Sequence, residues 1–343
     1  MSHAAAIIPE ARTPLEVQVV KTAQPGPKEI LIKNELIALI PIDAKQAKYG
    51  IFPIPYPSIL GTSYGGTVTA VGADVTKFKV GDKVAAVKAG AAGILGDRFS
   101  SFQQYVLSLE TTATKIPENV DISLPVGLIG NLTTVVAVFT EALGLTRPDP
   151  LGNAASQGKK VLVYGGTSSF GSLAVQYVSQ AGYDVVTTTS PRHKDIVAKL
   201  GASHIVDHTQ SPDAIIKELV AQGPYDYVVD SISLTETYEI TAAVVASQGG
   251  NTVYGLLPPP EQSSVPSSVS IDYRPWSITL AEEKNAELLS WSFHTYLYEA
   301  VANNKLVGLN VQKIEGGLAG LNDAIDILVK GVSGAKVVLD PRE

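Results

Sequence analysis

The 343-residue chain contains no cysteine. This absence excludes disulfide bonds, thiolate metal sites, iron–sulfur clusters and a cysteine nucleophile. Charged residues make up only 17% of the chain, and the formal net charge is −7. A mildly acidic chain lacks the basic surface that binds nucleic acid or anionic membranes, so we expect no nucleic acid and no membrane as partners.

The sequence predicts neither a targeting segment nor a membrane-spanning segment. Residues 1–11 do not combine a basic region with an apolar core, and no stretch approaches the roughly 18 apolar residues of a membrane span. We therefore expect a cytoplasmic protein. Hydrophobic residues reach 45%, enough for a sizeable core, and the length predicts about two domains.

The distribution of patterns along the chain predicts the fold class. The first third shows the alternation typical of β-strands, in short runs separated by glycine and proline turns, and residues 123–145 predict a long apolar helix. From residue 159, strand and helix patterns alternate, which predicts an α/β fold with a doubly wound parallel sheet of the Rossmann type. The predicted strands are 160–164, 184–188, 205–206, 225–230 and 251–257, and the predicted helices between them are 170–180, 194–200, 212–221 and 236–246.

A glycine-rich turn follows the first of these strands. Gly165 and Gly166 permit a tight turn, and Gly171 lets the next helix lie close to the strand, so that backbone amides can face a pyrophosphate. Ser168 replaces the middle glycine of the dinucleotide-binding pattern, and its hydroxyl is a candidate donor to a phosphate oxygen. The predicted cofactor-binding residues of this turn are Gly165, Gly166, Thr167, Ser168, Ser169, Phe170 and Gly171.

The end of the second strand favours NADPH over NADH. Residues 185–190 contain none of the acidic residues that hold the ribose hydroxyls in NAD enzymes. Instead Ser190 is followed by Arg192, His193 and Lys194, a hydroxyl and cations that suit a 2′-phosphate. An exposed basic helix start is the plain alternative, but cations at a helix N-terminus oppose the macrodipole and favour a bound anion.

Several segments resemble the medium-chain dehydrogenase/reductase superfamily. Residues 38–43, 60–68 and 71–84 carry its early motifs, and residues 316–321 and 331–338 match its closing helix and strand. The resemblance implies a GroES-like, partly open β-barrel substrate and catalytic domain. It would comprise residues 1–122 and 284–343, with residues 123–283 forming the Rossmann NADPH-binding domain.

The same resemblance argues against zinc. Zinc-dependent members carry a Gly-His-Glu motif where this chain has Gly61, Thr62 and Ser63. Their first cysteine ligand falls near Ile40, and their last ligand falls near Ile129 or Gly130. The chain therefore resembles the zinc-independent branch, which includes quinone oxidoreductases, alkene reductases and the fungal trans-acting enoyl reductases that serve polyketide synthases.

The resemblance also supplies catalytic candidates. In the substrate-facing loop, Lys45 would hydrogen-bond the cofactor ribose or the substrate carbonyl, Tyr49 would donate a proton, and Asp43 would orient the loop. Thr134, near the expected start of the apolar helix, would meet the nicotinamide ribose. A solvated lysine and a helix cap are the structural alternatives for Lys45 and Thr134.

Further cofactor contacts are implied beyond the second strand. His208 matches an aromatic position that flanks the 2′-phosphate, although an ordinary surface histidine is an equally good interpretation. The segment after the later strand would lie behind the nicotinamide; its residues are Tyr254, Gly255, Leu256 and Leu257.

These observations define three functional hypotheses. The first is a zinc-free, NADPH-dependent reductase of secondary metabolism that transfers hydride to an activated C=C bond. Its substrate would be a small-molecule enone or an enoyl thioester, such as one carried by a polyketide synthase. The second is an NADPH:quinone oxidoreductase, and the third is a catalytically silent NADPH-binding protein. Prolines 258–260 follow strand 251–257, taken as the sheet edge, and favour a monomer over a homodimer.

Overall fold

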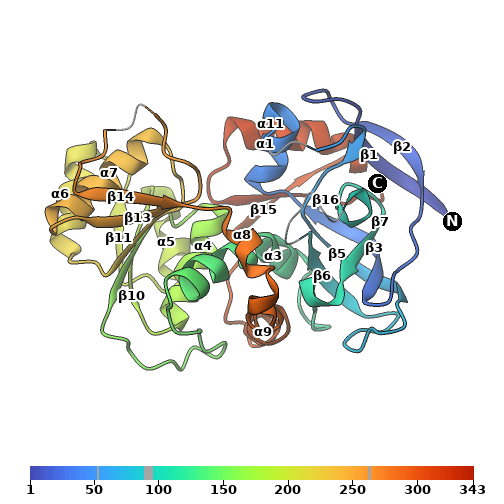
Figure 1. Cartoon of the computed structure of the whole chain (residues 1–343), viewed down its shortest axis with the longest axis horizontal. Coiled ribbons are helices and arrows are strands. Elements are labelled where there is room, and N and C mark those ends of the chain that lie inside the picture. The colour runs from blue at the N-terminus through green and yellow to red at the C-terminus, as the bar shows by residue number, and fades with distance from the viewer. Residues whose placement is uncertain (52–53, 89–95, 262–263) are drawn as a thin grey trace. The chain divides into compact units, whose positions relative to one another are not determined.

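The computed structural model describes residues 1–51, 54–88, 96–261 and 264–343. The chain divides into two compact units, whose elements are labelled in Figure 1. The first unit comprises residues 1–133, 280–304 and 310–343. The second comprises residues 134–279 and 305–309. Each unit has its own sheets and its own apolar core, so we describe them separately.

The first unit is built on β-sheets. A larger sheet has the strand order β15-β16-β3-β5-β6-β8, and β7 also pairs with β3. Its pairings are antiparallel except for β15 with β16. The strands are β3 (Glu29–Ala38), β5 (Ser63–Val71), β6 (Lys83–Val87), β7 (Tyr105–Leu109), β8 (Ala113–Lys115), β15 (Asn310–Ile314) and β16 (Ala335–Leu339). A smaller antiparallel sheet has the order β2-β1-β4, formed by β2 (Glu16–Lys21), β1 (Ser2–Ile8) and β4 (Ser58–Ile59).

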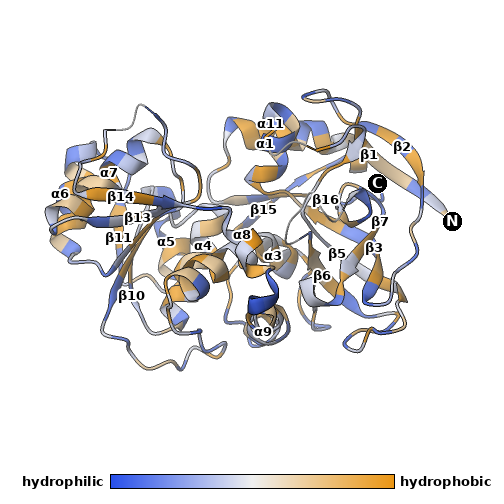
Figure 2. Ribbon diagram, in the orientation of Figure 1, coloured by the Kyte–Doolittle hydropathy of each residue, from blue (hydrophilic) through white to orange (hydrophobic). Residues whose placement is uncertain are grey.

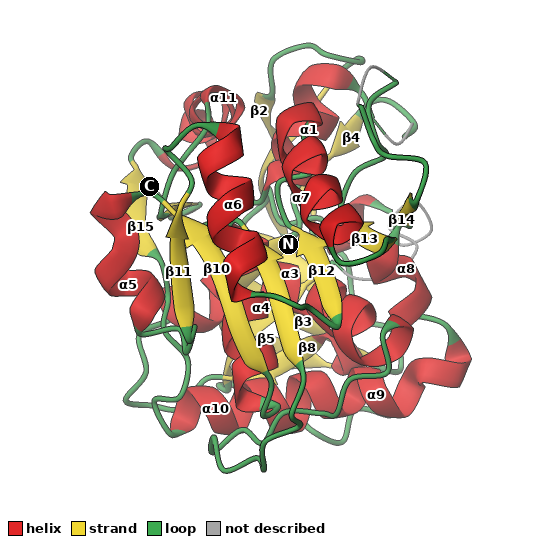
Figure 3. Cartoon of the chain, turned by 90° about the vertical axis from the view of Figure 1, so that its left-hand side faces the viewer, coloured by secondary structure: helices red, strands yellow, loops and turns green. Residues whose placement is uncertain are grey.

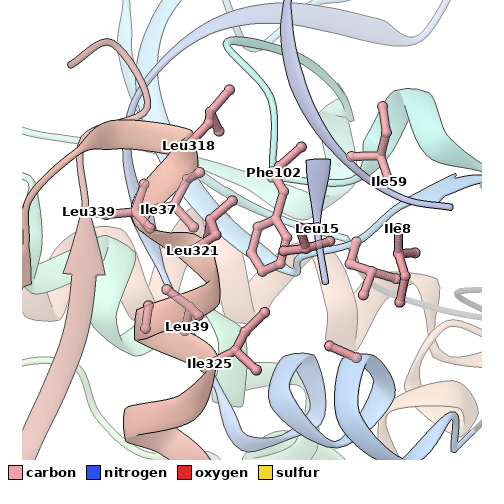
Figure 4. Close-up of a cluster of buried hydrophobic side chains, with 14 of the residues drawn as sticks. Ile8, Leu15, Ile37, Leu39, Ile59, Phe102, Leu318, Leu321, Ile325 and Leu339 are labelled. Atoms are coloured by element: carbon pink, nitrogen blue, oxygen red, sulfur yellow. The ribbon is translucent and has the colours of Figure 1, made fainter. Parts of the chain in front are cut away.

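Segments from both ends of the chain share the main core of the first unit. Figure 4 shows Ile8 and Leu15 facing Phe102, with Leu321 and Ile325 approaching from the C-terminal helix α11 (Leu321–Lys330). Leu321 and Ile325 are four residues apart, so they occupy one face of α11. The C-terminal segment is thus part of this unit's core. In Figure 2 both α11 and the neighbouring α1 (Pro41–Tyr49) carry apolar and polar residues, as expected for helices with one buried face.

Helix α1 replaces the loop that we expected to carry Asp43, Lys45 and Tyr49. Local signals explain the helix: Pro41 occupies its first turn, and the Asp43 carboxylate accepts a hydrogen bond from the Ile40 amide at 2.9 Å. Gly50 ends it with a φ of 65°. Other helical segments of this unit include η1 (Asp97–Phe99), η2 (Glu110–Thr112), η5 (Glu283–Asn285), α9 (Ala286–Trp291), η6 (Ser292–Leu297), α10 (Tyr298–Ala302) and η7 (Gly317–Gly320).

Helix α3 (Ser123–Val136) continues into the π-helical stretch η3 (Ala137–Ala142), which confirms the predicted apolar helix. Over its 20 residues this segment is long and apolar enough to cross a membrane by length and composition, so the expectation that no stretch approaches a span was wrong. Its most apolar window is 72% buried inside the protein. Burial of that extent identifies it as a core helix.

The second unit contains the predicted doubly wound sheet. Its strand order is β11-β10-β9-β12-β13-β14, and every pairing is parallel. The strands are β9 (Lys160–Tyr164), β10 (Asp184–Thr189), β11 (His204–Asp207), β12 (Tyr227–Asp230), β13 (Asn251–Gly255) and β14 (Val269–Tyr273). The connecting helices are α4 (Ser169–Gln180), α5 (Lys194–Ala198), α6 (Pro212–Gln222) and α7 (Thr235–Ser247), and Figure 3 shows α6 and α7 in front of the sheet.

Strand β14 corrects one expectation. Residues 251–257 are not the sheet edge, because β14 pairs with β13 from Asn251 to Gly255 and lies outside it. The prolines at 258–260 precede this added strand instead of protecting an edge. The argument that favoured a monomer therefore loses its basis, and the oligomeric state stays a prediction. Helix α8 (Trp276–Leu280) follows β14 and donates the Trp276 indole N–H to the Gly255 carbonyl at 2.8 Å.

Candidate functional site

The turn between β9 and α4 has the geometry predicted for a dinucleotide loop. Gly165 adopts a φ of 92°, a backbone conformation that residues with a side chain rarely adopt. A Cβ on Gly171 would lie 2.2 Å from the Gly165 carbonyl oxygen, and a Cβ on Gly166 would lie 2.5 Å from the Thr187 hydroxyl. All three glycines are therefore required by close approach or by backbone conformation. The tight packing brings the start of α4 directly against the end of β9.

The hydroxyl of Ser168 has a structural role in this turn. It is the N-cap of α4 and accepts a hydrogen bond from the Gly171 amide at 2.9 Å. Its oxygen also lies 3.0 Å from the Ser231 hydroxyl. Phe170 is buried and stacks on Phe139 at 6.3 Å between ring centroids, so its ring belongs to the core. The capping bond uses the hydroxyl oxygen as acceptor, so the predicted donation from Ser168 to a phosphate would compete only with its contact to Ser231.

The threonines at the end of β10 hold the turn in place. The Gly165 amide donates to the Thr188 hydroxyl at 2.9 Å, and the Gly166 amide donates to the Thr188 carbonyl at 2.9 Å. Thr189 reaches the Thr167 hydroxyl at 3.4 Å. The sequence analysis considered these residues only because none of them is the acidic residue that NAD enzymes carry at this place. Their hydrogen bonds fix the glycine turn against β10, the strand that pairs with β9 in the sheet.

A cluster of cations lies just beyond β10. Arg192 and Lys194 are exposed, and the pKa of His193 is lowered by partial burial and then by the positive charges of Arg192 and His208. The His208 amide donates to the Thr189 carbonyl at 3.2 Å, which ties the two segments together. These groups repel one another, so a bound anion would stabilise them all.

Ser190 supplies a polar atom at the same place. It is 8% exposed, and its hydroxyl oxygen is buried without a hydrogen-bond partner among the described residues. A buried hydroxyl without a partner is costly and is expected to be satisfied when a ligand binds. The hydroxyl and the neighbouring cations therefore fit the 2′-phosphate of NADPH. The structure thus brings Ser190, Arg192, His193 and His208 together beyond β10, and their role in cofactor binding stays a prediction.

The ends of β12 and β13 are joined by Ser233. This residue adopts a φ of 57° and accepts a hydrogen bond from the Leu256 amide at 2.7 Å. Asp230 fixes the turn through hydrogen bonds from the Ile232 and Ser233 amides, both at 2.9 Å. Ser233 is a residue that sequence reasoning missed. It positions the segment predicted to lie behind the nicotinamide.

The residues of that segment have different surroundings. Gly255 is buried, and a Cβ there would lie 1.8 Å from the Tyr238 hydroxyl oxygen, which donates to the Leu257 carbonyl. Tyr254 lines a surface groove together with Tyr227 and Thr252. Its side chain is thus directed to a groove among the strands and not to the glycine turn.

In the first unit, the three catalytic candidates lie on helix α1 and not on the loop that we expected. Lys45 and Tyr49 are four residues apart and therefore share a face of the helix. Burial lowers the pKa of Lys45, and Tyr49 is 54% exposed. Asp43 is 1% exposed, and burial raises its pKa to about 6. It lies in the first turn of the helix, and the orienting role expected for it stays a prediction.

Thr134 does not begin a helix. Helix α3 starts at Ser123, so Thr134 lies in its interior, where it is half-buried. The capping alternative for this residue is therefore wrong. Its predicted contact with the nicotinamide ribose stays a prediction, as do the roles of Lys45 and Tyr49.

The positions that hold zinc in zinc-dependent members meet in this unit. A Cβ on Gly130 would lie 2.0 Å from the Ser63 hydroxyl oxygen and 3.2 Å from Cγ2 of Ile40. Ile40, Ser63 and Gly130 lie at or beside the positions that the resemblance matched to the zinc site, and they carry an aliphatic side chain, a buried hydroxyl and no side chain at all. No group of three metal-binding carboxylates or histidines occurs in residues 1–51, 54–88, 96–261 and 264–343. The residues at this place do not fit a zinc ion.

Three polar residues beside these positions were missed. Thr62 donates its hydroxyl proton to Oδ1 of Asp43 at 2.6 Å. Lys336 on β16 is 4% exposed, and burial lowers its pKa to about 8, while the charge of Asp43 opposes that effect. Lys88 donates to the Ser100 hydroxyl at 2.8 Å and adds positive charge near Asp43. In the sequence, only Lys336 gave an indication of this cluster, because it is a lysine within an otherwise apolar strand.

Comparison with known proteins finds two family models, which match separate parts of the chain. Residues 26–118 match the alcohol dehydrogenase GroES-like domain, and residues 170–280 match the zinc-binding dehydrogenase family. A trans-enoyl reductase of Aspergillus japonicus, himH, is 32% identical, and the alignment covers 97% of this chain and 95% of that protein.

Two solved structures share the fold over nearly the whole chain. A quinone oxidoreductase from Pseudomonas syringae has a TM-score of 0.75 at 22% identity, covering 99% of this chain and 100% of that one. A mycobacterial protein in complex with NADPH has a TM-score of 0.73 at 21% identity, covering 99% and 100%. The GroES-like and Rossmann fold classes are thereby confirmed. The chain belongs to the medium-chain dehydrogenase/reductase family and is an oxidoreductase.

Proposed function

We propose that this oxidoreductase uses NADPH to reduce a C=C bond conjugated to a carbonyl group, in an enone or an enoyl thioester. The observation that carries the proposal is the anion site beyond β10, where a buried hydroxyl without a partner lies beside several cations. The name of the Aspergillus japonicus relative supports an enoyl substrate, and the mycobacterial neighbour supports NADPH. A thioester carried by a polyketide synthase fits this substrate class.

The second unit would bind and orient the cofactor. The start of α4 would face the pyrophosphate, because the glycines bring the helix close to the strand, while the Gly165, Gly166 and Gly171 amides are already bonded within the protein. Ser190 and Arg192 hold the 2′-phosphate, with His193, Lys194 and His208 adding positive charge. Bound NADPH supplies a hydride to the β-carbon of the substrate. The segment from Gly255 to Leu257, fixed by Ser233, lies behind the nicotinamide.

The first unit would supply the groups that act on the substrate. Reduction requires a donor to the carbonyl oxygen, where negative charge develops when the β-carbon receives the hydride. Lys45 is suited to this role, because it is half-buried on α1 and cationic. We propose that this donor acts without zinc, since Ile40 and Gly130 offer no ligand atoms. Thr134 would then help hold the nicotinamide ribose.

Quinone reduction is the second candidate, favoured by the fold shared with the Pseudomonas syringae enzyme. It uses the same cofactor site but gives a different product. Analysis of the reduced substrate, and not of NADPH consumption, distinguishes the two. An enoyl reductase gives a saturated carbonyl compound, whereas a quinone reductase gives a hydroquinone or a semiquinone.

The first experiment is a titration of the protein with NADPH and NADH, followed by intrinsic fluorescence. We expect NADPH to bind at least about tenfold more tightly, a difference of about 1.4 kcal/mol. Arg192→Ala should remove most of this preference, because it deletes a cation beside the 2′-phosphate. Lys217→Ala is the matched control, since Lys217 is an exposed lysine on α6. Equal affinity for both nucleotides, or an unchanged preference in Arg192→Ala, would contradict the assigned site.

A substrate screen completes the test. NADPH oxidation is followed with enones, enoyl thioesters and quinones, each with product analysis. We expect turnover with at least one conjugated alkene. Tight NADPH binding with no turnover on any of these substrates would refute the proposed reaction and leave only the cofactor site.

A further inference from the structure

The Asp43 carboxylate is a buried group that neither cofactor binding nor hydride transfer uses. Its two oxygens have separate partners: Oδ2 accepts from the Ile40 amide at 2.9 Å, and Oδ1 accepts from the Thr62 hydroxyl at 2.6 Å. Ile40 is itself buried, and Thr62 is partly exposed. Of these two partners, therefore, only the hydroxyl of Thr62 connects the carboxylate to a surface where a ligand can bind.

The position of Thr62 ties this pair to the reacting region. Thr62 precedes Ser63, whose hydroxyl meets Gly130 and Ile40 where zinc-dependent members hold their metal. The residues described at that place offer no set of metal ligands, so we assign proton transfer to side chains or water. The Ser63 hydroxyl oxygen is itself fully buried and cannot reach a substrate. The neighbouring Thr62 side chain is only partly buried, so we assign the contact with the substrate to its hydroxyl.

The charges around Asp43 suit a group that gains and loses a proton. Burial raises its pKa to about 6, while the hydrogen bonds from Thr62 and Ile40 and the charges of Lys336 and Lys88 limit the rise. Lys336 approaches from β16 and Lys88 from the end of β6. A carboxyl in this range exchanges protons readily near neutral pH, which is the property required of a general acid.

We propose that Asp43 and Thr62 form a proton relay that protonates the α-carbon of the substrate after hydride transfer. The inference rests on the proposed reduction of a conjugated alkene. Thr62 is the catalytic residue, because it touches the substrate, and Asp43 acts through it. Tyr49, the donor suggested by the sequence, is the last residue of α1 and is more than half exposed.

The step balances as follows. The hydride adds to the β-carbon with its electron pair, and the C=C π electrons move to form an enolate. The α-carbon then takes the hydroxyl proton of Thr62, forming the new C–H bond. In the same event the Thr62 oxygen takes the proton of the neutral Asp43 carboxyl, leaving a carboxylate that the Ile40 amide and the nearby lysines stabilise. A proton from water restores Asp43, so the net reaction consumes one hydride and one proton.

The test compares Thr62→Val with Thr62→Ser, and with Thr69→Val as the matched control. Valine keeps the shape of threonine and removes its hydroxyl, and serine keeps the hydroxyl. Thr69 is an exposed threonine of β5 whose hydroxyl donates to the Leu31 carbonyl. The substrate is the best α-methyl enone or enoyl thioester from the screen. The readouts are kcat, the configuration at the α-carbon of the product, and NADPH affinity by fluorescence.

We expect Thr62→Val to lower kcat by about 100-fold, the usual contribution of a positioned general acid. The remaining product should be nearly racemic at the α-carbon, because water then protonates the enolate from both faces. Thr62→Ser should restore a single configuration, and all variants should bind NADPH like the wild type. A structural role for Thr62 would lower activity without changing the configuration.

Asp43 is tested through the charge of Lys336. The relay needs a protonated Asp43, so kcat of the wild type should fall as the pH rises through the pKa of that carboxyl. Lys336→Met removes a positive charge beside the carboxyl, which stabilises its neutral form and raises its pKa. The falling limb should therefore move to higher pH. A limb that stays in place would show that Asp43 is not the proton source.

Three results would overturn the proposal. One is an unchanged configuration and kcat in Thr62→Val. Another is loss of configuration in Tyr49→Phe while Thr62→Val keeps it, which would make Tyr49 the donor. The third is failure of the wild type to reduce any alkene, which would overturn the proposed function together with the relay. The first two leave the proposed function intact, so the two failures are distinguishable.

Discussion

Replacing Gly171 with alanine tests whether close packing of α4 on the glycine turn is required for the cofactor site. The added Cβ would lie 2.2 Å from the Gly165 carbonyl oxygen, well inside contact distance. Because this atom is backbone, it cannot rotate away, and either α4 or the turn must move by roughly 1 Å to reach normal contact. Overpacking of this kind costs about 1–3 kcal/mol. Alanine regains about 0.5–1 kcal/mol of helix propensity, so a net loss of about 1–2 kcal/mol is expected.

Gly127→Ala is the matched control. Gly127 also lies within a helix, α3, but a Cβ there meets only Cγ of Lys336 at 3.6 Å, an ordinary contact. This variant should be neutral or more stable by up to about 1 kcal/mol. Both variants are measured by urea unfolding and by NADPH titration. The turn carries the pyrophosphate site, so Gly171→Ala should also weaken NADPH binding, whereas Gly127→Ala should not. Equal stability and affinity in the two variants would refute the argument from packing.

Two further predictions concern stability. Ser168→Ala should lower the free energy of unfolding by about 1 kcal/mol, because it removes the N-cap of α4, while Ser168→Gly should lower it by only a few tenths. Both variants are measured by urea unfolding, and unchanged stability in Ser168→Ala would contradict the capping role. Burial first, and then the charge of Lys77, lower the pKa of His294 to about 4, below its unfolded value of 6.5. The unfolded chain therefore binds the proton more readily between these values, so this contribution is present above pH 6.5 and is lost as the pH falls toward 4. His294→Phe, which keeps a ring beside Phe78, should flatten the rise of unfolding free energy with pH over that range; parallel curves would contradict this assignment.

The parallel sheet was predictable because its signals are local. Each strand from β9 to β12 is a short run followed by a helix, α7 leads into β13, and the glycine turn marks the first crossover. Strand β14 was missed because Val269–Tyr273 follows a segment rich in serine and proline and has no helix before it. Helix α1 was missed because only Asp43, Ala44 and Ala47 are buried, which gives no apolar stripe at helical spacing.

The candidate site was predictable only in part. Motif spacing predicts the cofactor residues and the positions matched to the zinc site, since these depend on the order of elements in the family. The hydrogen bond from Thr62 to Asp43 and the burial of Lys336 depend on tertiary packing. A lysine in a terminal strand has no local feature that distinguishes a buried charge from an exposed one.

The buried charges around Asp43 are better explained by function than by stability. Taking a carboxylate and an ammonium group out of water costs several kcal/mol for each ion, and apolar replacements of such pairs are often neutral or stabilising. This chain has few charged residues, yet it buries both Asp43 and Lys336 in one unit. The Asp43 carboxylate accepts from Thr62, which is only partly buried. The proposed reduction consumes a proton, and this gives the cluster a use that packing alone does not explain.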